Sequence, residues 1–112
     1  MDLHSTTHGT INIVTVNAER IDASVALQFK DAMRALTEDG PDHVVLDLGQ
    51  VKFIDSSGLG AIVASMKQMG KGRKLDLAAL SPDVDKVFRL TRMDSVFDIH
   101  SDVDGAKMRA AG

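Results

Sequence analysis

One stretch decides the fold: His43-Val-Val-Leu-Asp-Leu-Gly-Gln-Val-Lys-Phe-Ile-Asp-Ser-Ser-Gly-Leu-Gly-Ala-Ile-Val-Ala-Ser-Met66. It opens with an apolar run, Val44–Leu48, that is typical of a strand buried on both faces. Its second half has the apolar spacing of a helix, and the residues that share one face are Leu59, Ile62, Val63 and Met66. The polar turn Asp55–Gly58 stands at the start of that helix. Unpaired backbone N–H groups and the positive end of the helix dipole favour negative charge there.

The composition is that of one ordinary globular domain covering residues 1–112. The apolar fraction is 44% and the charged fraction 26%, and the core must be aliphatic because the chain has four Phe and no Trp or Tyr. A net charge of -3 and the few aromatic residues argue against nucleic-acid binding. The absence of cysteine excludes disulfides, thiol catalysis and zinc sites built from cysteine.

The sequence shows no targeting or membrane signal. Its first residues, Met1–His8, lack the basic and apolar regions of a signal peptide. No apolar run approaches the roughly 18 residues that a membrane-spanning helix needs. We therefore expect a cytoplasmic protein that does not contact the membrane.

The first third of the chain predicts two antiparallel strands within residues 3–17, with a turn at Gly9, followed by a helix. That helix is expected over Ala23–Thr37 with Asp22 as its N-cap. Its apolar stripe consists of Val25, Phe29, Ala32 and Leu36. Gly40-Pro41 ends the segment, because proline cannot continue a helix.

After residue 43, strands and helices alternate. The expected elements are the strand Val44–Leu48, a helix Ser57–Met69, a strand Leu75–Leu80, a helix that begins at Ser81-Pro82, a strand Val96–Ile99 and a last helix capped within Ser101–Asp104. This order indicates an α/β fold with a mixed sheet. The strands should be parallel where helices cross over and antiparallel at the N-terminal pair.

The turn Asp55-Ser-Ser-Gly58 has two interpretations. From local chemistry alone, an ordinary helix cap worth about 1 kcal/mol is the favoured one. However, two consecutive hydroxyls exceed what one cap needs. Gly58 and Gly60 also remove side chains from the helix start, so another molecule could approach the backbone.

Catalytic and metal-binding interpretations fail on spacing. A nucleophile elbow needs glycine two residues before the serine, and this chain has Ile54 before Ser56 and Asp55 before Ser57. The four histidines, which could supply a base, lie outside the turn: His4, His8, His43 and His100. No phosphate-binding glycine loop is present. We expect neither an enzyme nor a metal site nor a cofactor.

Three segments together resemble the STAS domain of bacterial anti-sigma factor antagonists. They are Val44–Leu48 followed by Val51-x-Phe-Ile-Asp-Ser-Ser-Gly-Leu-Gly60, the pair Ile21-Asp22 before the first helix, and Leu75–Leu80 followed by Ser-Pro-x-Val. The resemblance extends over nearly the whole chain. It implies a single STAS domain with a mixed sheet of four to five strands and about four helices, packed mainly on one side.

The resemblance also implies a function, partner switching in the regulation of transcription. In the family, a serine at the start of the second helix is phosphorylated by an anti-sigma factor that is also a serine kinase, of the histidine-kinase-like ATPase fold. The matching residue here is Ser56, with Ser57 as the alternative. The unphosphorylated domain binds the kinase and so releases a sigma factor. A serine phosphatase reverses the modification.

The resemblance further implies a partner-binding surface made of Asp22, Asp55, Ser56, Ser57, Gly58, Gly60 and Lys67. One departure bears on how the partner docks: Glu19 stands where the family commonly has glycine. Another assembly, such as a lipid-transport ATPase complex or a different partner-switching complex, would use the same face. The sequence leaves the oligomeric state open between a monomer and a weak dimer.

Overall fold

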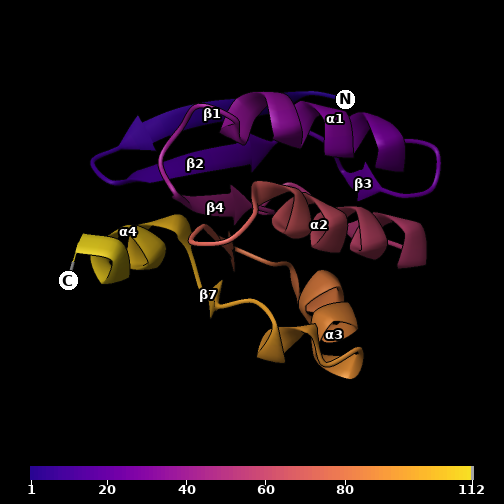
Figure 1. Ribbon diagram of the computed structural model, residues 1–112. Coiled ribbons are helices and arrows are strands. Elements are labelled where there is room, and N and C mark those ends of the chain that lie inside the picture. Colours follow the sequence, from indigo (N-terminus) through magenta and orange to yellow (C-terminus); the bar gives the residue numbers. More distant parts are fainter. Residues whose placement is uncertain (112) are drawn as a thin grey trace.

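A computed structural model describes the backbone of residues 1–111 and the side chains of residues 1–110. A five-stranded sheet has the order β1-β2-β4-β6-β7 (Figure 1). The strands β1 (Leu3–His8) and β2 (Ile11–Val16) form an antiparallel hairpin around Gly9, whose φ of +60° suits glycine. The strands β4 (His43–Asp47), β6 (Lys74–Ala78) and β7 (Ile99–His100) add in parallel. The mixed sheet predicted from the sequence is confirmed.

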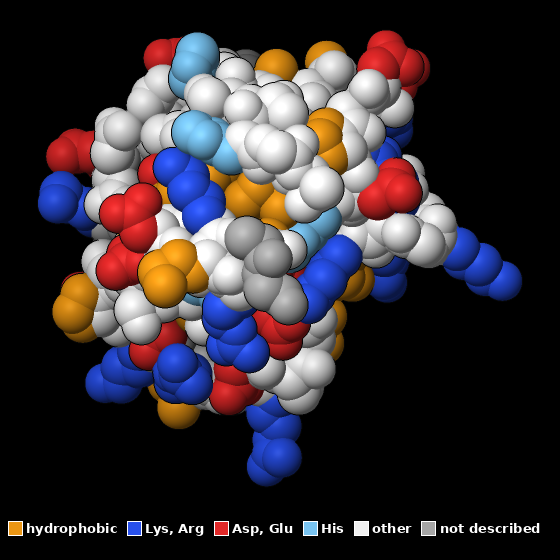
Figure 2. All heavy atoms as spheres, turned by 90° about the vertical axis from the view of Figure 1, so that its left-hand side faces the viewer, with side chains coloured by type: hydrophobic (Ala, Val, Ile, Leu, Met, Phe, Trp, Pro, Cys, Tyr) orange, Lys and Arg blue, Asp and Glu red, His pale blue; other side chains and the backbone are white. Residues whose placement is uncertain are grey.

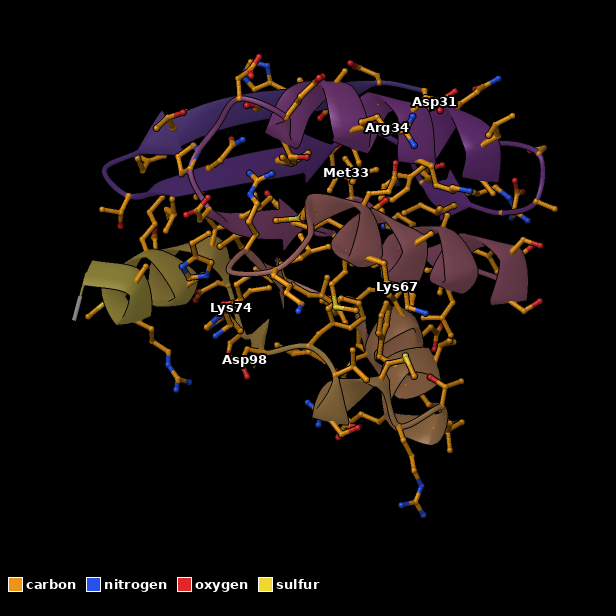
Figure 3. All side chains as sticks on the ribbon, in the orientation of Figure 1. Asp31, Met33, Arg34, Lys67, Lys74 and Asp98 are labelled. Atoms are coloured by element: carbon orange, nitrogen blue, oxygen red, sulfur yellow. The ribbon has the colours of Figure 1, made fainter. Side chains whose placement is uncertain are left out.

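Helices cover the two faces of the sheet unequally. Three helices pack on one face over the main core: α1 (Ala26–Thr37), α2 (Ser56–Met69) and α3 (Pro82–Leu90). Met33 is a residue of α1 whose side chain enters this core (Figure 3). Side chains alternate along a strand, so Val44 and Leu46 enter this core while Val45 faces the opposite way. There, α4 (Val103–Ala111) covers a smaller cluster formed by Ile11, Ile13, Val45, Ala78 and Ala106.

A second sheet, in segments where the sequence predicted no strand, consists of β3 (Arg20–Ile21) and β5 (Phe53–Ile54), paired in parallel. Two-residue strands are too short for a periodic signal in sequence. The sheet brings the chain before α1 alongside the chain before α2. It lies at the end of the molecule toward which β4 points (Figure 1).

The predicted start of the first helix was wrong. α1 begins at Ala26 after Val25, not at Ala23, and Asp22 is not its N-cap. Instead, Asp22 accepts hydrogen bonds from the backbone N–H and the hydroxyl of Ser24, at 3.1 and 2.6 Å. The Val25 N–H donates to the Asp22 carbonyl at 3.1 Å, which closes a turn ahead of the helix. The cap residue identified from the sequence therefore stabilises this turn.

Other boundaries also differ from the prediction. The strand expected over Leu75–Leu80 ends at Ala78. α2 begins one residue early, at Ser56, because Asp55 is its N-cap. The predicted strand Val96–Ile99 is mostly absent: a 3₁₀ turn, η1 (Met93–Ser95), precedes it, and β7 holds only Ile99–His100. Phe97 is buried edge-on against Phe88 with ring centroids 6.1 Å apart, so its apolarity reflects core packing and not a strand.

The last two helices begin at the predicted residues. Ser81 is the N-cap residue of α3, with Pro82 in the first turn, but its hydroxyl donates to the Val51 carbonyl at 3.2 Å and makes no capping bond. At the start of α4, the Asp102 carboxylate accepts from the Gly105 N–H at 2.6 Å. Among residues 1–111, none of the helices has the length and apolarity needed to cross a membrane. Figure 2 views the end of the molecule that carries α4, where acidic and basic side chains are interspersed.

Candidate functional site

Asp55 holds two loops together at the start of α2. One carboxylate oxygen accepts from the Gly58 N–H at 2.8 Å, which caps the helix. The other accepts from the Ala23 N–H at 3.2 Å, in the turn before α1. The expected helix cap is thus present, and Asp55 alone supplies it. The two neighbouring serines are left free for another role.

Ser56 and Ser57 are exposed at the first turn of α2. Within residues 1–110, neither hydroxyl forms a hydrogen bond. The offsets of 4 and 11 residues place Ser56, Gly60 and Lys67 along one row of the helix. Lys67 is exposed in the last turn (Figure 3). At the helical rise of 1.5 Å per residue, it lies about 17 Å from Ser56 along the helix axis. The structure therefore brings these three predicted residues onto one face.

The two glycines of this helix do different things. Gly58 is buried, and a Cβ atom there would lie 1.9 Å from the Ile21 carbonyl oxygen. Its missing side chain admits the protein's own β3 strand, so the expectation that Gly58 opens the surface to a partner is not supported. At Gly60, a Cβ atom would meet nothing within 4 Å. Gly60 is the glycine that leaves room at the surface.

Asp22 lies beside this helix start in a charged cluster. Hydrogen bonding from Ser24 and the neighbouring Arg20 guanidinium holds the pKa of Asp22 below its usual value. The Arg20 Nε atom is 3.2 Å from the Asp22 carboxylate. The Arg20 guanidinium also lies 4.2 Å from the ring centre of Phe53, which is 41% exposed. Arg20 and Phe53 join the site through the pairing of β3 with β5, which the sequence did not reveal.

A groove of about 430 Å³ runs between α1 and α2 from this face. Its lining residues are Ala23, Ala26, Leu27, Lys30, Ser57, Gly60, Ala61 and Ala64. Leu27 is 68% exposed although it is strongly apolar. The small side chains on α2 create the groove, and Ser57 is one of its lining residues whereas Ser56 is not. The two hydroxyls thus face different surroundings.

Glu19, the departure noted in the sequence, acts here through its backbone. Its carbonyl accepts from the N–H groups of Lys52 and Phe53 at 2.7 and 3.1 Å, while the residue as a whole is exposed. Its negative charge therefore stands at the surface next to the small sheet.

Two of the histidines, His43 and His100, form hydrogen bonds away from this site. The Nε2 atoms of His43 and His100 each lie 2.9 Å from the same carboxylate oxygen of Asp76, which is buried. His4 and His8 belong to β1. Within residues 1–110, no group of three His, Asp or Glu side chains is arranged to hold a metal ion. The site offers two exposed serine hydroxyls beside the groove between α1 and α2.

Comparison with known proteins identifies the family. The model of the STAS domain matches residues 3–106. The chain belongs to the STAS domain family. BtrV of Bordetella bronchiseptica, assigned to the anti-sigma factor antagonists, is 31% identical over 99 residues, which are 88% of this STAS chain and 77% of BtrV. The anti-sigma-F factor antagonist RsfB of Mycobacterium tuberculosis is 25% identical, over 88% of this chain and 80% of RsfB.

Solved structures agree with this assignment. An anti-sigma factor antagonist from Mycobacterium paratuberculosis superimposes with a TM-score of 0.87 at 26% identity, covering 99% of this STAS chain and 94% of that protein. SpoIIAA in its unphosphorylated form, 18% identical, shares the fold with a TM-score of 0.78 over 99% of this chain and 97% of SpoIIAA. These relatives are named anti-sigma factor antagonists. The same fold also occurs in part of a murine anion transporter, which is 18% identical with a TM-score of 0.77 over 95% of this chain and 18% of the transporter.

Proposed function

We propose that this chain is an anti-sigma factor antagonist, a binding module switched by phosphorylation of Ser56. Unphosphorylated, it binds an anti-sigma factor that is also a serine kinase of the histidine-kinase-like ATPase fold, and thereby releases a sigma factor. A serine phosphatase restores the binding state. The module acts in the cytoplasm and is not itself an enzyme. The names of its relatives support the first step, binding of an anti-sigma factor.

The observation that supports a phosphate acceptor in this turn is the pair of free, exposed hydroxyls of Ser56 and Ser57 at the first turn of α2, and the resemblance to the family favours Ser56 over Ser57. Asp55 already caps this helix, so the Ser56 side chain is not needed for a capping hydrogen bond. The backbone N–H groups of Ser56 and Ser57 precede the first intrahelical bond, which runs from the Leu59 N–H to the Asp55 carbonyl. These N–H groups and the helix dipole favour an added phosphate.

The charge of a phosphate, about -1.5 to -2, would therefore act on the interface and not on the fold. The partner-binding face we propose contains the six exposed or half-exposed predicted residues, which are Asp22, Asp55, Ser56, Ser57, Gly60 and Lys67. A protein packed against Ser56 would meet a bulky dianion. It would also lose contact along the groove between α1 and α2.

The test is phosphorylation and binding with purified kinases of this fold from the same genome. Wild type should gain one phosphate by mass spectrometry with ATP, Ser56→Ala should gain none, and the neighbouring Ser57→Ala should behave as wild type. Ser56→Asp should weaken kinase binding at least tenfold while its melting temperature stays close to that of wild type. If the Ser56→Ala variant gains a phosphate as the Ser57→Ala variant does, the assignment to Ser56 is refuted.

A different assembly is the competing function, in which this face docks onto an ATPase complex such as one for lipid transport. Affinity purification of the endogenous protein distinguishes the two. Recovery of a serine kinase supports our proposal, and recovery of transporter ATPase subunits with unmodified Ser56 contradicts it.

A further inference from the structure

The free edge of β1 is unprotected. Exposed edge strands are usually blunted by charged residues, proline, a bulge, short length or a covering element. β1 spans six residues, Leu3–His8, with no Lys, Arg, Asp, Glu or Pro, and its pairing with β2 runs residue for residue without a bulge. It forms one end of the strand order (Figure 1). The opposite edge strand, β7, has only two residues and is flanked by the ion pair of Lys74 with Asp98.

The hydrogen-bonding pattern shows which backbone groups of β1 point outward. The Asn17 N–H donates to the Asp2 carbonyl at 2.9 Å, so the pair Asp2–Asn17 is a hydrogen-bonded pair of the hairpin. Bonded and non-bonded pairs alternate in an antiparallel ladder. The even-numbered residues of β1 therefore bond to β2. The N–H and C=O groups of Leu3, Ser5 and Thr7 face away from the sheet.

We propose that β1 pairs antiparallel with β1 of a second copy of this chain, with the twofold axis at Ser5. In this register, Ser5 lies opposite Ser5 of the second copy, and Leu3 lies opposite Thr7. The outward groups of these three residues are all used, giving about six backbone hydrogen bonds across the axis. The two sheets join into one continuous sheet.

Side chains favour this register over its neighbour. Centring on Ser5 sets the exposed Asp2 of each copy opposite the exposed His8 of the other, on the same face. Centring on Thr6 instead sets His4 opposite His8. It also needs outward groups from Gly9, which lies in the turn with a φ of +60°. The pairing of Asp2 with His8 and the number of backbone bonds thus both favour the axis at Ser5 over the axis at Thr6.

The dimer is compatible with the candidate site. In the sheet order, β1 is separated from β6 by β2 and β4. The helix α2 packs against α1, β3, β5 and β6, and α1, which contacts β1, lies between α2 and the β1 edge. Both copies would therefore keep the first turn of α2 exposed. A single strand edge buries less than the roughly 1,200 Å² of a stable interface, so the association should be weak and dependent on concentration.

Analytical ultracentrifugation from micromolar to millimolar concentration tests the association. We expect a dimer that grows with concentration. Thr7→Pro removes one outward N–H without removing a bond to β2, because proline is tolerated where an edge N–H faces solvent. It should weaken association at least tenfold. The matched Thr7→Ala keeps the N–H and should associate as wild type does, and melting curves verify that both variants fold.

Cross-linking tests the register, since the chain has no cysteine and any disulfide must join two copies. Ser5→Cys should form a covalent dimer on mild oxidation, because paired Cα atoms about 5.5 Å apart suit a disulfide. Thr6→Cys should not, since its counterpart lies beyond the 7 Å limit in this register. A chain that stays monomeric at millimolar concentration overturns the proposal, as does cross-linking through Thr6→Cys in place of Ser5→Cys.

Discussion

Among single residues, three neighbours at the start of α2, Asp55, Ser56 and Gly58, have different structural roles. Asp55 ties the turn before α1 to the start of α2 through its two oxygens. Gly58 allows α2 to approach the Ile21 carbonyl. Ser56 is exposed and takes part in neither contact. The site is therefore a rigid base, built by Asp55 and Gly58, that presents an unoccupied hydroxyl.

The two glycines provide a direct test of this division. Gly58→Ala should lower the free energy of unfolding by about 2–4 kcal/mol, because the added Cβ meets backbone 1.9 Å away that cannot move alone. Gly60→Ala should raise it by about 0.5–1 kcal/mol, because alanine is the better helix former and the space is open. Urea denaturation measures both. Equal effects would show that α2 does not approach β3 this closely.

At the scale of elements, the β7–α4 segment is attached by few interactions. Two backbone bonds flank β7, from Leu77 N–H to the Asp98 carbonyl at 2.9 Å and from Ala79 N–H to the His100 carbonyl at 3.1 Å. The His100 side chain binds the buried Asp76. Lys74 adds an ion pair with Asp98, whose side chains lie close together in Figure 3. Side chains thus substitute for a longer strand.

The ion pair gives this attachment a pH dependence. Its hydrogen bond to Lys74 holds the pKa of Asp98 below its usual value, and the same bond raises the pKa of Lys74. The Asp98 carboxylate therefore stabilises the folded state fully at pH values above about 3.9, the pKa of aspartate in the unfolded chain. This stabilisation is lost as the pH falls through the lower pKa that Asp98 has in the folded state. The ammonium stabilises below about pH 10.4, and this is lost as the pH rises through its raised folded pKa.

Asp98→Asn should therefore lower the free energy of unfolding at pH 7 by less than about 1 kcal/mol, since both side chains are more than half exposed. The difference from wild type should shrink toward zero in strong acid. Asp39→Asn, at an exposed position with no ion pair among residues 1–110, is the control and should show no such trend. A difference that persists at pH 2 would contradict this account.

At the scale of the whole molecule, two cores of unequal size lie on the two faces of one sheet. The main core under α1, α2 and α3 contains aromatic and large aliphatic side chains such as Phe29, Phe88 and Leu46. The core under α4 contains small or β-branched side chains, with Ala106 the buried residue of the helix. Because burial of apolar area scales with stability, the α4 face should be the weaker half.

Native-state hydrogen exchange measured by mass spectrometry checks this difference. Amides of α4 and β7 should exchange through openings that cost less free energy than global unfolding, whereas those of β4 and β6 should exchange only with global unfolding. Low concentrations of urea should accelerate exchange in β4 and β6, which exchange by global unfolding, far more than in α4 and β7, which exchange by smaller openings. Uniform protection across the chain would show that the two cores unfold as one unit.

Local sequence patterns were sufficient to predict several elements of this protein. Apolar runs and helical spacing predicted the strand Val44–Leu48, the helix after Asp55 and the α/β class. A strand buried on both faces has a continuous apolar sequence, and a helix buried on one face has apolar residues at helical spacing. Proline and serine at Ser81-Pro82 marked the start of α3 for a local steric reason. The polar turn identified Ser56 and Asp55 as neighbours at a helix start.

The support of that turn depends on contacts between segments that are far apart in the chain. The two-residue strands β3 and β5 leave no periodicity, yet their pairing places Ala23, Arg20 and Phe53 at the site. The role of Gly58 depends on the position of the Ile21 carbonyl, 37 residues away in the chain. Contacts between distant segments depend on how whole elements pack, and a local sequence pattern does not encode them.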